Sequence, residues 1–310
     1  MPEYNPAQLE VIKLLGRHDI APVDFPAGLA EDLRAELDEA LVPLADRIED
    51  GETIFISKHA LTGLHGCEAH HLATKGGFAW SVPNARGTVA HKAIELAIHW
   101  RGDPYPMTLV DEAIARLAND DKALGLFLQA LTEADLSQLR GECTDLVAKF
   151  EEAFPPLLPQ WRPVTESKSV VELVDGKVRL TGKVDLTLGR FDPTTPTKVI
   201  IDLKSGVSRP QHREDLRFYA LVETLKLGTP PRLLATFYLD TARPHTETVN
   251  GALLRSALAR TIDGIYREVE LREGRPPVAV PGPACRWCPI TDDCAAGLAY
   301  LAEAAERDGW

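Results

Sequence analysis

The spacing of the cysteines constrains this chain more than any other feature. Cys285, Cys288 and Cys294 form a C-x2-C-x5-C run near the C-terminus, and Cys67 lies far upstream. Short gaps of this kind let several thiolates converge on one metal centre. We therefore expect Cys67 and the C-terminal run to close as a clamp around the segment between them.

The kind of metal centre follows less directly from the spacing. Two thiolates separated by two residues fit either zinc or an iron–sulfur cluster. Zinc sites more often use two close pairs, whereas this chain has a compact triple and one distant residue. Unconnected buried thiols are the third interpretation. The fifth cysteine, Cys143, lies in a helical pattern without a partner motif, so we expect a small buried residue there.

Length and composition set the general class. The chain has 310 residues, enough for one large domain or two modest ones, and no apolar run long enough for a membrane helix. Its first residues carry no secretory signal pattern, so we expect a cytoplasmic protein, in which cysteines serve as metal ligands more often than as disulfides. The net charge of −12 disfavours broad non-specific binding to nucleic acid but allows a local basic groove.

The hydrophobic pattern changes along the chain. Apolar residues at helical spacing predict helices within 5–50, 86–101 and 108–153, and a short strand followed by a helix capped near Ser57 within 53–73. Alternating patterns then predict strands at 169–174, 177–189, 197–206 and 232–240, and Asp175-Gly176 is the expected hairpin turn between the first two. We also expect helices at about 210–227 and 250–272. This order predicts a mixed α/β core with a helical insertion.

Two of the predicted strands carry the residues with the clearest chemistry. Asp202 and Lys204 point to the same side of a strand because side chains alternate. If the neighbouring strand brings Asp185 alongside, two carboxylates and one ammonium group share a small volume. Such carboxylates bind Mg²⁺ or Mn²⁺, which activates water and stabilises a pentacoordinate phosphate, while the lysine orients the nucleophile or offsets charge. Taken alone, the short motif is more typical of solvent-facing charges on half-exposed strands.

Two further residues are candidates because of their position. His91, on the predicted helix at 86–101, is a candidate third metal ligand, although a surface histidine on an amphipathic helix would have the same pattern. Tyr219 lies one helix after Lys204. It is a candidate for contacting a phosphate or positioning the lysine, and packing against the sheet is the alternative.

Taken in order, these motifs resemble one branch of a known nuclease superfamily. The motifs are the early cysteine of SKHALTGLHGCEAHHL, then RGTVAH, GKVDL, IIDLKSG, a helix containing a tyrosine, and the final cysteine run. The series resembles the RecB-type branch of the PD-(D/E)XK nucleases, in particular its members with a cysteine-bound iron–sulfur cluster. These include the CRISPR-associated RecB-like exonucleases and the AddB nuclease domain. The resemblance covers roughly residues 53–300.

The resemblance implies a fold and a set of functional residues. The implied fold is α/β and restriction-endonuclease-like, with a mixed central sheet flanked by helices. It would have a helical segment at 1–50, a nuclease domain at 51–310 and a helical insertion at about 101–160. The implied metal ligands are His91, Asp185 and Asp202, and the catalytic residues are Lys204, Asp185 and Asp202. The implied [4Fe–4S] ligands are Cys67, Cys285, Cys288 and Cys294.

The chain departs from the family at one motif. The family's Gln-x-x-x-Tyr reads here as Asp215 to Tyr219, and an aspartate cannot donate the amide hydrogen bond of a glutamine. Gln211, one helical turn earlier, is therefore a candidate substrate-binding residue together with Tyr219. Glu166 is a further candidate acidic group.

The expected activity is that of a Mg²⁺- or Mn²⁺-dependent DNA exonuclease that hydrolyses phosphodiester bonds and prefers single strands. DNA repair, recombination or CRISPR-type processing would be its setting, with a helicase or a recombination or CRISPR protein as partner. The alternative is a non-catalytic iron–sulfur adaptor that binds DNA and relies on a partner for chemistry. The acidity and Asp215 favour the adaptor, whereas the complete catalytic set disfavours it. A third interpretation is a zinc-stabilised nuclease-like protein, which would be colourless rather than brown.

Overall fold

The structure is a computed structural model that describes residues 3–16, 25–75, 77 and 79–307. The chain forms two compact units. The first unit comprises Met1–Ala30, Trp80–Ser169 and Gly182–Leu254. The second unit comprises Glu31–Ala79, Val170–Thr181 and Arg255–Trp310.

A mixed sheet forms the centre of the first unit. Strand β3 (Val178–Leu188) pairs antiparallel with β4 (Val199–Lys204), and β4 pairs parallel with β5 (Leu233–Tyr238). The edge strand β6 (Arg243–Thr248) then pairs antiparallel with β5. Strands β4 and β5 are almost wholly buried, because helices cover both of their faces. Strand β6 was not predicted, because its sequence, RPHTET, lacks an apolar alternation.

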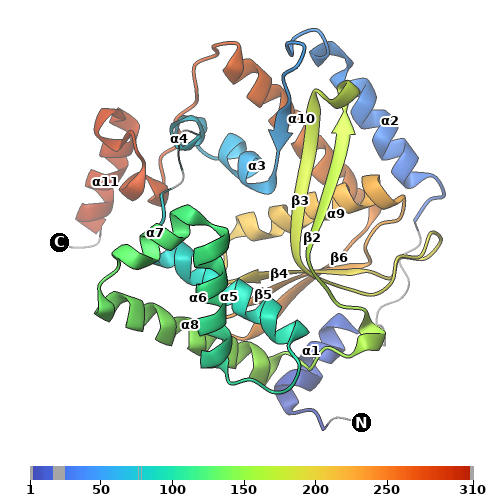
Figure 1. The fold of residues 1–310 in the computed structure, drawn as a ribbon. Helices are drawn as coiled ribbons and strands as arrows, with labels where there is room; N and C mark the ends of the chain where they lie inside the picture. The colour runs from blue at the N-terminus through green and yellow to red at the C-terminus, as the bar shows by residue number, and fades with distance from the viewer. Residues whose placement is uncertain (1–2, 17–24, 76, 78, 308–310) are drawn as a thin grey trace. The chain divides into compact units, whose positions relative to one another are not determined.

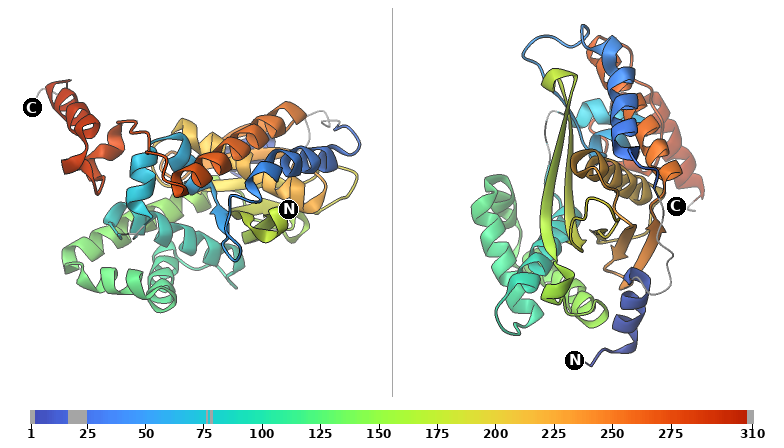
Figure 2. Two further views of the ribbon diagram at one scale, coloured as in Figure 1. Left: turned by 90° about the horizontal axis from the view of Figure 1, so that it is seen from above. Right: turned by 90° about the vertical axis from the view of Figure 1, so that its right-hand side faces the viewer.

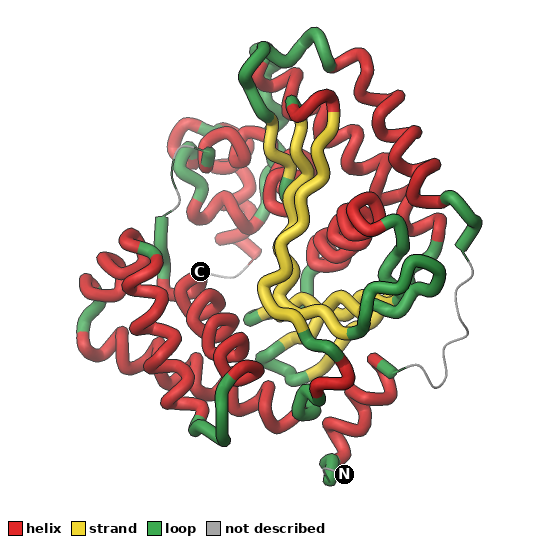
Figure 3. Tube along the Cα trace, turned by 45° about the vertical axis from the view of Figure 1, so that its right-hand side comes forward, coloured by secondary structure: helices red, strands yellow, loops and turns green. Residues whose placement is uncertain are grey.

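A long hairpin joins β3 to the preceding strand, β2 (Val164–Leu173), and Figure 3 shows its twist in yellow. The predicted turn at Asp175-Gly176 is confirmed. Asp175 has φ of 52° and Gly176 has φ of 86°, the left-handed conformations that tight hairpin turns require. Each of these two strands has residues in the first unit and residues in the second unit.

Helices cover both faces of the sheet in the first unit. Alternate residues of β4 and β5, among them Ile201 and Phe237, share one apolar core with the helices that precede the hairpin. These helices are α1 (Pro6–Leu15), α5 (Val82–His99), α6 (Pro106–Asp120), α7 (Lys122–Ala130) and α8 (Glu133–Ala153). Helices α5 to α8 stay grouped together in Figures 1 and 2. Helix α9 (Pro210–Leu227) packs against β4 and β5 on the other face.

The helical run predicted over 108–153 divides into three helices. Asp121 ends α6, and its side chain accepts hydrogen bonds from the amides of Ala123 and Leu124 at the start of α7. Thr132 caps α8 in the same way by accepting from the amide of Asp135. Caps of this kind satisfy the free amides of a first helical turn, so short polar residues break the apolar pattern here.

The second unit contains the early helices and the C-terminal region. Its elements are α2 (Leu29–Leu41), β1 (Ile54–Ile56), α3 (Lys58–His65), α4 (Glu68–Thr74), α10 (Gly251–Arg272) and α11 (Ala295–Arg307). Strand β1 pairs parallel with the start of β3. Ser57 accepts a hydrogen bond from the amide of Ala60, which confirms the predicted cap of α3. Cys285 lies in a short 3₁₀ turn, Pro283–Trp287, which Cys288 directly follows, and Cys294 directly follows a second such turn, Thr291–Asp293.

The fold class is therefore confirmed as mixed α/β, with a central mixed sheet of six strands flanked by helices. The strand order is β1-β3-β4-β5-β6, with β2 paired to β3. Among the helices that the structure describes, none has the length and apolar character that a membrane span requires. The expected division at residue 50 and the expected insertion at about 101–160 stay predictions.

Candidate active site

Four side chains from three elements of the first unit gather at one place. Asp185 lies near the end of β3, Asp202 and Lys204 lie on β4, and His91 lies on α5. The Nζ atom of Lys204 lies 2.7 Å from Oδ2 of Asp202. The Nδ1 atom of His91 lies 3.5 Å from Oδ1 of Asp185, whose Oδ2 accepts the amide hydrogen of Leu203 at 2.8 Å. The structure thus places Asp185 beside β4, as the strand pattern predicted.

The burial of this group is unusual for charged residues. Asp202 has no exposed surface, and the side chain of Lys204 is 18% exposed. A carboxylate removed from water is costly unless an opposite charge and hydrogen bonds compensate it. The ammonium group of Lys204 supplies that charge for Asp202. The alternative that Asp202 is a solvent-facing charge is therefore wrong.

The acidic neighbours of His91 affect its ionisation. Burial of the imidazole lowers its pKa, but the charge of Asp185 and its hydrogen bond outweigh burial. The net result is a raised pKa for His91. An imidazole beside carboxylates lies in an environment that favours positive charge.

Helix α9 brings a third carboxylate to the site, and it is the second one beside the lysine. Oδ2 of Asp215 lies 3.7 Å from Nζ of Lys204, and Asp215 is buried. Tyr219, one turn later, is 3% exposed and lies against Gly182 of β3, where an added Cβ would be 3.1 Å from the ring. Gln211 lies on the exposed first turn of α9. Of the two candidates for substrate binding, Gln211 is thus on the surface and Tyr219 is in the packed interior.

Two glutamates that the strand motifs do not include also lie at this site. Glu95 and Glu166 line a small cavity of about 10 Å³ together with His91 and Asp185. Glu95 follows His91 by four residues, so the helical period could have indicated that both share one face. Glu166 forms an ion pair with Lys183 and has φ of 53°, which is uncommon for a residue other than glycine.

The donor chemistry of the site fits a divalent cation. Carboxylate oxygens and one imidazole are ligands that Mg²⁺ and Mn²⁺ accept. Within the described residues, however, no three His, Cys, Asp or Glu side chains stand in a metal-binding arrangement. Asp202 is engaged by Lys204, and Asp185 accepts a backbone amide, so both carboxylates have partners within the protein. The residue types therefore fit the ion, and the two carboxylates stand where their hydrogen-bond and ion-pair partners within the protein place them.

The cysteines of the second unit are surrounded by backbone amides. The sulfur atoms of Cys67, Cys285 and Cys294 each accept an N–H group at 3.4 Å, from Val280, Gly282 and Gly297 respectively. A Cβ atom added to Gly297 would lie 3.5 Å from the Cys294 sulfur and 3.6 Å from the Cys285 sulfur. Amide hydrogen bonds of this kind stabilise thiolates, which are the form that binds metal.

The remaining cysteines differ from this group. The amide of Cys288 donates to the carbonyl of Cys285, which holds Cys288 at the end of the first 3₁₀ turn. Cys143 is fully buried on α8, and burial raises its pKa to about 12. The prediction of a small buried residue at Cys143 is confirmed.

A buried ion pair holds Cys67 near the C-terminal segment. Glu68, which follows Cys67, is 1% exposed and accepts hydrogen bonds from both terminal nitrogens of Arg275, at 2.8 and 3.0 Å. It also accepts the amide hydrogen of Val278 at 2.9 Å. Because Val280 binds the Cys67 sulfur, this carboxylate fixes the segment that leads to the cysteine run.

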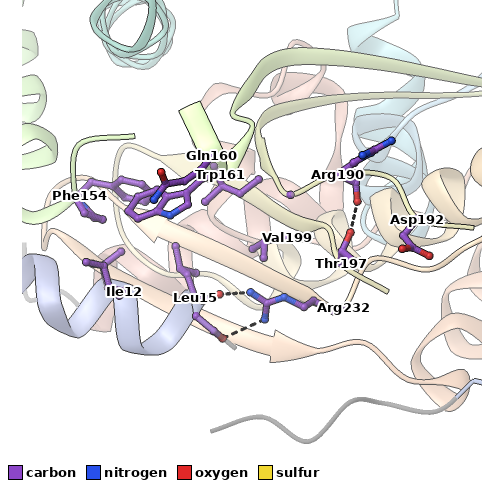
Figure 4. A pocket seen from close by; sticks show the side chains of 15 residues that line it. Ile12, Leu15, Phe154, Gln160, Trp161, Arg190, Asp192, Thr197, Val199 and Arg232 are labelled. Carbon is purple, nitrogen blue, oxygen red and sulfur yellow. Dashed lines mark hydrogen bonds between the residues drawn. The ribbon is translucent and has the colours of Figure 1, made fainter. Parts of the chain in front are cut away.

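A larger cavity of about 490 Å³ lies elsewhere in the first unit, and Figure 4 shows it from close by. Ile12 and Leu15 of α1 and the ring of Trp161 line it, together with Arg232, which donates to the carbonyl oxygens of Leu15 and Gly16. None of the candidate catalytic residues lines this cavity. We place the candidate site at the group of Asp185, Asp202, Lys204 and His91, because charge, burial and the strand motifs meet there. Of these residues, His91 and Asp185 also line the smaller cavity.

A family model matches most of the chain. The family model described as the PD-(D/E)XK nuclease superfamily matches residues 55–295. No curated protein sequence matches the chain.

Two solved structures are similar in part. A proposed exonuclease from Eubacterium rectale is 13% identical, with 77% of this chain and 87% of that chain covered and a TM-score of 0.49. A protein described as SSO0001 is 16% identical, with 87% and 97% covered and a TM-score of 0.32.

Proposed function

Because the chain belongs to the PD-(D/E)XK nuclease superfamily, we propose that it is a metal-dependent DNA exonuclease that prefers single strands. The observation that carries this proposal is the buried pair of Asp202 and Lys204, with Asp185 and His91 beside it. Nucleases of this superfamily use divalent metals such as Mg²⁺ or Mn²⁺. The acidic site supplies the oxygen ligands that such ions need.

Each side chain has a role in the proposed reaction. Asp185, Asp202 and His91 would hold the ion, which when bound activates water and offsets the charge of the phosphate. Lys204 would donate a hydrogen bond to the attacking water or to a phosphate oxygen as negative charge develops there. Asp202 and Asp215 keep its ammonium group in place. The burial of the site excludes bulk water and strengthens each of these interactions.

The test is cleavage of end-labelled single-stranded DNA by the full chain with Mg²⁺ or Mn²⁺. We expect the wild type to shorten the DNA and Lys204→Ala to lose activity by about two to three orders of magnitude. Lys122→Ala, which removes an exposed lysine at the start of α7, is the matched control and should retain full activity. A folded wild-type protein that cuts no DNA with either ion would contradict the proposal.

We also propose that Cys67, Cys285, Cys288 and Cys294 hold a [4Fe–4S] cluster. The spacing of the run and the amides directed at three of the sulfurs support this. Protein purified without oxygen should then be brown and contain iron. Cys288→Ser should lose iron and colour and unfold at a lower temperature. Cys143→Ala, the control, should keep its iron and its colour. A colourless wild type that contains zinc would exclude the cluster and favour the zinc alternative.

The competing function is a non-catalytic DNA-binding adaptor with the same cluster. The net charge of −12 and the third carboxylate, Asp215, beside Lys204 favour it. The sequence has no Gly-rich phosphate loop of the form G-x-x-x-x-G-K-[ST], so a helicase partner would supply any unwinding. A wild type that binds single-stranded DNA in a direct binding measurement but does not shorten it in the cleavage assay would identify the adaptor.

A further inference from the structure

Three polar side chains form a hydrogen-bonded chain at the end of β5. The hydroxyl of Ser208 donates to the hydroxyl oxygen of Tyr238 at 2.9 Å, and that oxygen lies 3.1 Å from Nδ1 of His212. The rings of His212 and Tyr238 are also in contact, with centroids 5.7 Å apart. None of these residues has a role in the mechanism described above.

The strand register places this chain beside the candidate active site. Lys204 and Tyr238 are paired residues of the parallel strands β4 and β5, so their side chains stand on the same face of the sheet. Helix α9 covers that face, and His212 precedes Asp215 by three residues on it. Asp215 contacts Lys204, so the face of α9 that carries His212 is the one turned toward the lysine.

The hydrogen bonds select one form of the imidazole. The Tyr238 hydroxyl oxygen accepts a hydrogen bond from the Ser208 hydroxyl. Its own O–H group can therefore donate a hydrogen bond to Nδ1 of His212. Burial lowers the pKa of His212, and the charge of Lys204 lowers it further, which favours the neutral ring. The single ring proton is then on Nε2, which has no hydrogen-bond partner among the described residues.

We propose that the Nε2–H group of His212 binds a phosphodiester oxygen of the DNA strand next to the reacting phosphate. Tyr238 and Ser208 act as positioning residues that fix the ring and its tautomer. The proposal rests on the nuclease function proposed above and extends it to substrate binding. Contacts of polar side chains with phosphate oxygens set the register of a bound strand without reading its sequence. A contact beside the scissile bond would therefore hold the strand over Lys204.

Two amide variants separate the donor from the shape of the side chain. In His212→Gln the amide nitrogen lies close to the former Nε2 position, so a donor is retained. In His212→Asn the amide lies close to the former Nδ1 position, so the bond to Tyr238 can persist while the donor is lost. Both are compared with the wild type by the KM and kcat of single-strand cleavage. Binding of a labelled oligothymidylate in Ca²⁺, without cleavage, is measured in parallel by fluorescence anisotropy.

We expect His212→Asn to raise KM and Kd about tenfold with little change in kcat, the scale of one lost hydrogen bond to a charged group. In His212→Gln, KM and Kd should stay within about threefold of the wild-type values, because the amide donor is retained but its geometry is less favourable. Tyr238→Phe, which releases the tautomer but keeps the ring, should give an intermediate loss. Unfolding temperatures of all variants show whether packing is preserved.

Two results would overturn the inference. One is wild-type KM and Kd in His212→Asn. The other is an equal loss in both amide variants at equal unfolding temperature, because the donor would then not matter. A wild type that binds the oligonucleotide but never cleaves it would instead refute the proposed nuclease function. The anisotropy comparison would still decide whether His212 contacts DNA.

Discussion

Asp202 and Lys204 show how two residues of one strand can set the chemistry of a site. The strand ends in Ile-Ile-Asp-Leu-Lys, so its apolar residues enter the core and carry the two charged side chains into a region almost free of water. Electrostatic interactions are stronger there than at the surface, and an unpaired charge is costly. The pair is therefore held in one geometry before any substrate arrives.

Asp215 offers the sharpest prediction at this scale. It is the second carboxylate on the ammonium group of Lys204, at 3.7 Å, where the family motif has a glutamine. We expect Asp215→Asn to lower kcat about tenfold, or roughly 1.4 kcal/mol, because the lysine loses one of the charges that position it. The measurement is steady-state cleavage of labelled DNA. Glu214→Gln, on the neighbouring surface, is the control. An unchanged kcat in Asp215→Asn would mean that Asp202 alone positions the lysine.

Residue-level prediction from the sequence succeeded where the geometry is local. Alternation along one strand correctly placed Asp202 and Lys204 together, and the strand order placed Asp185 beside them. It missed His212 and Tyr238, because they meet only after β4 and β5 pair in register and α9 packs across them. No spacing in the sequence encodes that contact.

At the scale of elements, the helices of the first unit are fixed by close backbone contacts as well as by apolar patterns. Gly125 of α7 lies so close to α6 that an added Cβ would stand 2.5 Å from the carbonyl oxygen of Ala118. Backbone atoms cannot move aside as a side chain can. By contrast, nothing lies within 4 Å of the corresponding point at Gly141 on α8.

These two glycines give a matched pair of substitutions. We expect Gly125→Ala to lower the free energy of unfolding by about 1–3 kcal/mol, because the helices must separate. Gly141→Ala should raise it by about 0.5–1 kcal/mol, since alanine restricts the unfolded chain and favours the helix. Urea denaturation followed by circular dichroism measures both. Equal effects of the two substitutions would show that the approach of α6 and α7 is not tight.

Most element types were predictable and most contacts were not. The helix predicted at about 210–227 is α9, and the one at about 250–272 is α10. Helix α11 and strand β6 were not predicted, since α11 directly follows the cysteine run and β6 lacks alternation. Tertiary pairing decides a strand such as β6, because its local pattern is weak.

At the scale of the molecule, the second unit draws on three separate parts of the chain. Its early helices are joined to α10 and to the segment that follows α10 by buried charges. Glu68 binds Arg275, and Glu268 of α10 accepts hydrogen bonds from His71, Lys75 and Arg272. Bringing together segments that lie far apart in the chain costs conformational entropy, and these long-range pairs help to offset that cost. Sequence patterns could not predict them, because the partners lie far apart.

The Glu268 cluster makes stability depend on pH. Burial raises the pKa of Glu268, but the hydrogen bonds from His71, Lys75 and Arg272 outweigh it and lower the pKa from 4.5 to about 2. Because the folded pKa lies below the unfolded one, the stabilisation is complete above about pH 5 and is lost as the pH falls toward 2. At about 1.4 kcal/mol for each unit of the shift, the contribution at neutral pH is at most about 3 kcal/mol.

Glu268→Gln should therefore lower the free energy of unfolding by about 2–3 kcal/mol at pH 7 and by less than half of that at pH 3. Urea denaturation of both proteins at the two pH values measures the difference. Glu303→Gln, on the exposed surface of α11, is the control and should change neither value by more than about 0.5 kcal/mol. A loss that is the same at pH 7 and pH 3 would show that Glu268 stabilises the unit through packing, not through its charge.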